Sequence, residues 1–133
     1  MLKIEHIGIA VRSLDESEKL FDSLLNQISY KHESVPSENV NTSFYKLKET
    51  KIELLEGTSP ESSISRFIEK KGEGVHHIAF EVADIYIEMK RLSKAGFILL
   101  SQEPKPGADN KLVCFLHPKN TNGVLIELCQ EIK

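Results

Sequence analysis

The chain has 133 residues, of which 40% are hydrophobic and 28% charged, and its formal net charge at pH 7 is -3. These values are typical of one soluble globular domain and argue against a disordered chain. The mildly acidic balance argues against sequence-independent binding of nucleic acid, and no hydrophobic run approaches the roughly 18–20 residues that span a bilayer.

The first half of the chain predicts a strand, a helix and three further strands. The opening segment alternates, so that Ile7 and Ile9 share one face of a strand and His6 lies on the other. Ser13 followed by Glu16 is a capping box, which predicts the start of a helix. The apolar face of this helix is expected to hold Leu14, Leu20, Phe21, Leu24 and Leu25. The expected elements are a strand at 4–11, a helix at 14–25 and strands at 28–33, 41–48 and 51–55.

The second half predicts the same order of elements. A short helix is expected to connect the halves, with Pro60 at its first position and Gly72 just past its end. In the next strand His77 lies opposite the apolar face, Asp84 can cap the following helix, and Gly96 suits the end of that helix. The expected elements are a strand at 77–82, a helix at 85–95 and strands at 97–101, 111–117 and 124–129.

Equivalent residues recur in the two halves, which indicates a duplicated module. His6 and His77 are 71 positions apart, and Glu53 and Glu127 are 74 positions apart. Two copies are too few for a stacked solenoid, so we expect one domain over residues 1–133. It would consist of module 1 (1–57), a linker helix (58–73) and module 2 (74–133).

Four ionisable residues lie on the polar side of their predicted strands. His6, Glu53, His77 and Glu127 are each flanked by apolar residues that are expected to face the helices. Alone, each would more often be a structural residue than a ligand. Their recurrence in matched positions of two copies instead predicts a metal site, because two imidazoles and two carboxylates suit a divalent Co, Ni, Zn or Mn ion. We therefore expect one such ion per chain, with positions left open for water or substrate oxygen.

The fold expected from this pattern is α+β. Two βαβββ modules would form a curved mixed sheet around a metal-binding cleft. The other histidines have simpler interpretations: packing or hydrogen bonding for His76, an exposed position for His32, and a turn residue, phosphate contact or proton relay for His117. Cys114 and Cys129 lie in apolar stretches without a paired spacing, so we expect buried, reduced thiols.

Several sequence blocks are more specific than the repeated pattern. They include the paired histidines His76 and His77, the run His117-Pro118-Lys119, and residues 5–11, 51–55 and 123–128. Together these blocks resemble the vicinal-oxygen-chelate superfamily, whose members have the glyoxalase fold, and within it the methylmalonyl-CoA epimerase family. The Asp-Pro-Asp-Gly run that is more typical of glyoxalase I before the last strand is absent.

The resemblance implies a ligand set. The metal ligands of the family fall on His6, His77, Glu127 and, in the last strand of the first module, Glu53. This set agrees with the one expected from strand parity. Some members have a further catalytic carboxylate in the strand that we place at 41–48, where this chain has Asn, Thr, Ser, Phe and Tyr at positions 41–45.

The resemblance also implies an activity, which is metal-dependent epimerisation of methylmalonyl-CoA by removal and return of the C2 proton. Glu127 is expected to act as ligand and base, and Glu53 as ligand or as the partner on the opposite face. Glyoxalase I is the alternative, because the same ligands would serve it, and a non-catalytic ligand-binding protein is the third. We expect an acyl-CoA thioester substrate, a homodimer, no nucleic-acid or membrane partner and, since the N-terminus lacks a signal peptide, a cytoplasmic location.

Overall fold

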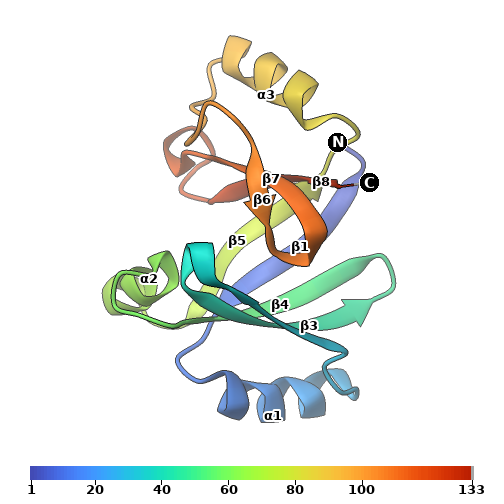
Figure 1. Ribbon diagram of the computed structural model, residues 1–133, viewed down its shortest axis with the longest axis vertical. Coiled ribbons are helices and arrows are strands. Elements are labelled where there is room, and N and C mark those ends of the chain that lie inside the picture. Colours follow the sequence, from blue (N-terminus) through green and yellow to red (C-terminus); the bar gives the residue numbers. More distant parts are fainter. Residues whose placement is uncertain (133) are drawn as a thin grey trace. The chain divides into compact units, whose positions relative to one another are not determined.

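The structure is a computed structural model that describes residues 1–132 (Figure 1). It contains a strand, a helix and three strands twice, with one helix between the two sets. In chain order the elements are β1 (Lys3–Ala10), α1 (Leu14–Leu25), β2 (Lys31–Val35), β3 (Val40–Leu47), β4 (Thr50–Gly57), α2 (Ser63–Lys71), β5 (Gly74–Glu81), α3 (Ile85–Lys94), β6 (Lys105–Gly107), β7 (Lys111–Leu116) and β8 (Ile126–Glu131). Short 3₁₀ turns lie at Pro36–Glu38, Ala108–Asn110 and Pro118–Asn120.

The eight strands form one mixed sheet, as expected for an α+β fold. Their hydrogen-bonded order is β2-β3-β4-β1-β5-β8-β7-β6. The pair β5 and β8 is parallel, whereas β2–β3, β3–β4, β6–β7 and β7–β8 are antiparallel. No helix among residues 1–132 combines the length and the apolar character that crossing a bilayer requires.

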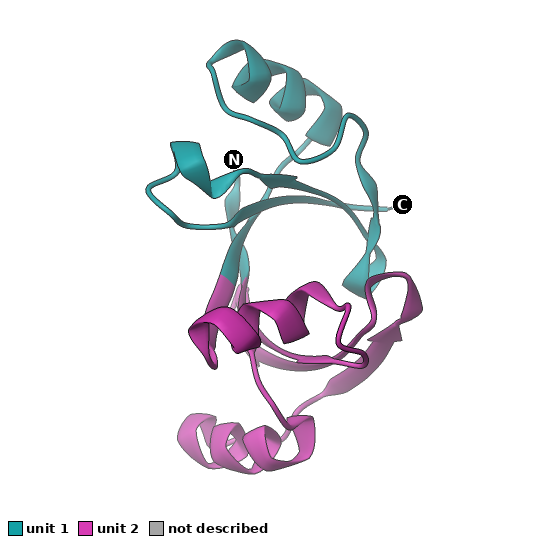
Figure 2. Cartoon of the chain, turned by 90° about the vertical axis from the view of Figure 1, so that its left-hand side faces the viewer, with its two compact units in different colours: residues 1–6, 77–133 teal, residues 7–76 magenta. Residues whose placement is uncertain are grey.

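Contacts divide the chain into two compact units, coloured separately in Figure 2. Unit 1 joins residues 1–6 with the chain from His77 onwards, and unit 2 contains Ile7–His76. The first residues of β1 and most of β5 therefore belong to the same unit as β8.

In unit 2, helix α1 packs against β3 and β4. Its start is capped as predicted, since the Ser13 hydroxyl accepts a hydrogen bond from the Glu16 backbone N–H. The expected apolar face is only partly correct, because Leu20 and Leu24 are 68% and 71% exposed. The core instead contains Val11, Leu14, Tyr45 and Leu54, with Ile9, Phe21, Leu25 and Ile52 packed against it.

In unit 1, helix α3 covers one face of β7 and β8 (Figure 1). The Asp84 carboxylate caps its start by accepting from the Ile87 N–H, and Gly96 follows its end with φ of 98°, both as predicted. Cys114 and Cys129 are free and buried, as expected. The core beneath the helix is formed by Val82, Ile85, Met89, Leu92, Cys114, Leu116 and Leu128.

Three sequence-based expectations are wrong in position. The strand predicted at 28–33 is displaced toward the C-terminus and forms β2 at Lys31–Val35. The predicted strand at 97–101 is reduced to a single bridge between Leu99 and Leu116, and the edge strand is β6. The linker helix begins at Ser63 rather than at Pro60, because the Ser62 hydroxyl accepts from the N–H groups of Ile64 and Ser65 and so caps its first turn.

Candidate metal centre

Three strands of unit 1 bring together three of the four predicted ligands. His6 lies on β1, His77 on β5 and Glu127 on β8. Because β5 and β8 pair in parallel with Ala79 opposite Glu127, the side chain of His77, two residues before Ala79, extends from the same face of the sheet as Glu127. All three side chains are buried, with exposed fractions of 5–6%.

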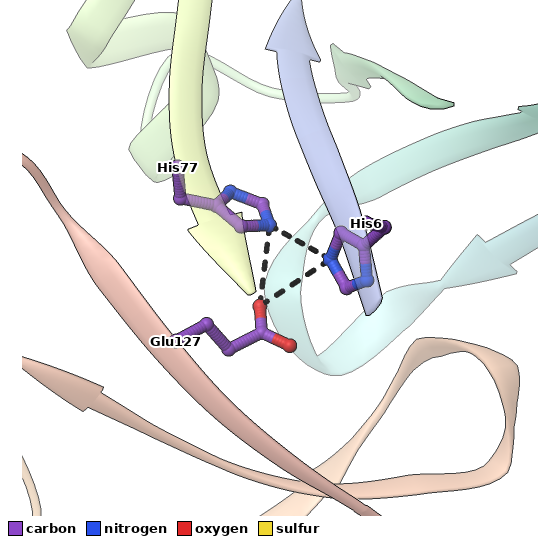
Figure 3. Close-up of side chains that lie close together, drawn as sticks. All are labelled: His6, His77 and Glu127. Carbon is purple, nitrogen blue, oxygen red and sulfur yellow. Dashed lines mark hydrogen bonds and ion pairs between the residues drawn. The ribbon is translucent and has the colours of Figure 1, made fainter. Parts of the chain in front are cut away.

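The ligating atoms of these residues converge (Figure 3). The Nε2 atoms of His6 and His77 are 3.0 Å apart. Glu127 Oε1 lies 3.2 Å from His77 Nε2 and 3.8 Å from His6 Nε2. Both contacts end on the same carboxylate oxygen, so one nitrogen from each ring and one oxygen surround a common point.

This arrangement fits a divalent metal ion. Two ligand atoms bound at about 2.1 Å and 90° to one another are about 3.0 Å apart, and about 3.4 Å apart at a tetrahedral angle. The observed separations of 3.0, 3.2 and 3.8 Å are close to these values. Two imidazole nitrogens and one carboxylate oxygen are also a donor set that borderline divalent ions accept. Among the described residues, this is the cluster of three or more His, Cys, Asp or Glu side chains whose ligand atoms lie close together.

The electrostatics keep the Glu127 carboxylate ionised. Burial alone would raise the pKa of this group, but the hydrogen bond with His77 and the electrostatic interactions with the His6 and His77 rings outweigh it, so the net pKa is lowered. A buried carboxylate is costly without a compensating charge. The site therefore presents a negative ligand to a cation.

The sequence analysis missed two residues that contact the histidine rings. The Glu5 carboxylate lies 3.0 Å from Nδ1 of His6 and is 2% exposed. The Phe115 ring packs edge-to-face on His77, with ring centroids 5.6 Å apart. Phe115 is opposite Glu127 in the β7–β8 ladder, which explains its position beside the cluster. Strand alternation could have placed Phe115, but it assigns Glu5 to the face opposite His6.

The fourth predicted ligand, Glu53, belongs to unit 2. It lies on β4 opposite Phe44 of β3 and is 4% exposed. Its position on the face opposite the α1 core agrees with the parity analysis, since its neighbours Ile52 and Leu54 contact that core. Its role as a ligand stays a prediction.

The remaining histidines have the simpler of the roles considered. His76 packs edge-to-face on Phe67, with ring centroids 5.0 Å apart. His32 is exposed and pairs with Glu18 at 2.6 Å. His117 caps the 3₁₀ turn that follows it, because its Nδ1 accepts from the Lys119 N–H.

Comparison with known proteins places the chain in a superfamily. Residues 5–115 match the model of the Glyoxalase/Bleomycin resistance protein/Dioxygenase superfamily. The chain belongs to this superfamily.

Relatives that match over nearly the full length narrow the relationship. An uncharacterised Bacillus subtilis protein, YqjC, is 36% identical over 130 residues, which cover 98% of this chain and 93% of that protein. The ethylmalonyl-CoA/methylmalonyl-CoA epimerase of Cereibacter sphaeroides is 41% identical over 130 residues, covering 96% and 97%. Among solved structures, a Streptomyces coelicolor methylmalonyl-CoA epimerase variant in complex with 2-nitronate-propionyl-CoA superposes with a TM-score of 0.96 at 31% identity, covering 100% and 99%. Within the superfamily, this chain is thus related to methylmalonyl-CoA epimerases.

Proposed function

We propose that this protein is a metal-dependent isomerase that epimerises methylmalonyl-CoA at C2. The observation that carries the proposal is the convergence of His6, His77 and Glu127 on one buried point in a chain related to such epimerases. Without that relationship the cluster would support only a metal-binding protein, and without the cluster the relationship would not indicate where an ion binds.

His6, His77 and Glu127 would hold the ion, with Glu53 as the proposed fourth ligand. A divalent Co, Ni, Zn or Mn ion held there would supply Lewis-acid stabilisation of negative charge on the thioester oxygen. The burial of the three residues excludes bulk water from around their ligating atoms, which strengthens every charge interaction there.

Proton transfer is assigned to the glutamates. Both histidine contacts of Glu127 are made by Oε1 and not by the second oxygen of the carboxylate, as the dashed lines in Figure 3 show. That second oxygen can accept a proton on one face of C2. Epimerisation also needs an acid on the other face, because the proton must return from the opposite side. Glu53 is proposed for that role as an alternative to its role as a ligand.

The test is a direct assay of both candidate reactions. The protein is stripped with a chelator, reconstituted with Co²⁺ and supplied with (R)- or (S)-methylmalonyl-CoA, and in parallel with the hemithioacetal of methylglyoxal and glutathione. If the protein is an epimerase, it should interconvert the two CoA thioesters, and this activity should be lost on chelation and restored by the ion. Turnover of the hemithioacetal alone would identify a glyoxalase I, and turnover of neither by metallated protein would favour a non-catalytic binding protein.

A further inference from the structure

A buried carboxylate lies behind one of the metal-site histidines. Glu5 is 2% exposed, and its Oε1 atom is 3.0 Å from Nδ1 of His6. Adjacent residues of a regular strand point to opposite faces, so this contact is not a consequence of strand geometry. The far side of the same ring faces the cluster, where His6 Nε2 is 3.0 Å from His77 Nε2. Glu5 and the cluster therefore bind opposite nitrogens of one imidazole.

The chemistry of this contact fixes which nitrogen of His6 carries the proton. A carboxylate oxygen can only accept a hydrogen bond, so the His6 Nδ1–H donates to Glu5. A neutral imidazole protonated on Nδ1 has its lone pair on Nε2. Nε2 is the atom that faces His77 and Glu127, and only an unprotonated nitrogen can bind a metal ion.

The charges around His6 also favour a metal ion at the cluster. Glu5 at Nδ1 and Glu127 beside Nε2 place two buried carboxylates around one imidazole. A buried carboxylate is costly unless it is paired or coordinates a metal ion. A divalent cation between the histidines would be stabilised by both negative charges.

We propose that Glu5 is a positioning residue for the metal site, which orients the His6 ring and holds it in the tautomer whose Nε2 can bind the ion. The inference rests on the metal site of the proposed function and is independent of the substrate. It is tested on metal binding without acyl-CoA, so a failure of epimerase activity would leave it unaffected.

The experiment measures the His6 tautomer and the affinity for Co²⁺ in the full-length chain. In the metal-free wild-type protein at alkaline pH, ¹⁵N NMR of the imidazole is expected to show Nδ1 protonated and Nε2 unprotonated. Co²⁺ affinity, from competition with a chromophoric chelator, is expected to fall about 10–100-fold in Glu5→Ala, as for loss of other outer partners of histidine ligands. Glu5→Gln retains an oxygen acceptor of the same size and should recover part of that loss.

Two control variants separate positioning from stability and from general charge. Leu92→Ala weakens the α3 core of the same unit, and Glu131→Ala removes an exposed carboxylate that pairs with Lys111. Both should bind Co²⁺ as the wild type does. The proposal is overturned if Glu5→Ala has wild-type affinity, if either control loses as much affinity as Glu5→Ala, or if wild-type His6 is protonated on Nε2. If Glu5→Ala does not fold, the tautomer of His6 in the wild-type protein decides whether the proposal holds.

Discussion

The Nε2 atoms of His6 and His77 lie 3.0 Å apart although 71 positions separate the residues in the chain. The two rings meet almost at right angles, with an interplanar angle of 85°. The two residues occupy the same position in the opening strands of the two βαβββ sets. This contact brings together a donor atom from the opening strand of each set, which neither set could provide alone.

The first prediction concerns the histidine ligands. His6→Ala and His77→Ala should each lower Co²⁺ affinity by more than the roughly 10–100-fold that loss of an outer partner costs, because each removes a donor atom. The measurement is competition with a chelator of known affinity. His117→Ala is the matched control. Because His117 caps an exposed turn, this variant should bind Co²⁺ as the wild type does. Unchanged affinity in both ligand variants would contradict the assignment of the site.

The second prediction separates the two roles of Glu127. Glu127→Gln keeps an oxygen atom but removes the negative charge and the basicity, so the epimerisation rate should fall by orders of magnitude while the protein stays folded. Glu127→Ala should lower the rate similarly and also weaken Co²⁺ binding. Rates are measured on metal-reconstituted protein, with circular dichroism to check folding. A Glu127→Gln protein with near wild-type rate would exclude this residue as the base.

The third prediction concerns a buried hydroxyl in unit 2. The Tyr45 hydroxyl donates to Asp22 at 2.6 Å, and burial together with this carboxylate raises its pKa well above the ordinary value of about 10. Tyr45→Phe should lower the free energy of unfolding by about 1.5–3 kcal/mol near neutral pH, because it leaves a charged group without its donor.

The sign of the pH dependence follows from the raised pKa of Tyr45. Its contribution is fully present below the pKa of the unfolded chain and is lost as the pH rises toward the folded value, by about 1.4 kcal/mol per pH unit. Urea unfolding above pH 10 should therefore show the wild type and Tyr45→Phe converging. Tyr86→Phe, at an exposed position, should change stability by less than about 0.5 kcal/mol. A constant difference at all pH values would contradict the interpretation.

Much of the fold followed from periodicity, and the errors have physical causes. Residues 97–101 alternate in burial as a strand would: Phe97 and Leu99 pack on the α3 core, whereas Ile98 and Leu100 are exposed. Alternation indicates which face is buried and not how many backbone groups pair. Here the pairing is limited to the Leu99–Leu116 bridge, where the Leu100 N–H donates to the Phe115 carbonyl and the His117 N–H to the Ile98 carbonyl. Strand β6 has no such pattern, and its Pro106 lacks an N–H, which is tolerated at the edge of a sheet.

The site was predictable to the extent that strand parity and duplication determine it. The sequence analysis could predict His6, His77 and Glu127 because each lies opposite an apolar face and each has an equivalent residue in the other half of the chain. Glu5 has no such signal. It is adjacent to His6 in sequence, and alternation assigns it to the other face, so only the folded chain reveals that its carboxylate contacts the ring.

A fourth prediction tests Glu53, which the sequence analysis assigned as a ligand. If it binds the ion, Glu53→Ala should weaken Co²⁺ binding and change the visible absorption spectrum of the Co²⁺ protein, because the number of bound oxygen atoms changes. If it serves only as the second acid, affinity and spectrum should stay as in the wild type while the rate falls. Loss of neither binding nor rate would exclude both roles. Glu56→Ala, on the same strand, removes the acceptor of the Leu14 N–H and so provides a control for lost stability without loss of a proposed ligand.

The central claim is tested most directly by solvent-deuterium incorporation at C2 of methylmalonyl-CoA. Epimerisation through removal and return of the C2 proton predicts that the Co²⁺-reconstituted protein in heavy water introduces deuterium at that carbon, as followed by mass spectrometry. Incorporation should cease on chelation and should be reduced by orders of magnitude in Glu127→Gln. A fully metallated wild-type protein that introduces no deuterium into methylmalonyl-CoA would contradict the proposed function.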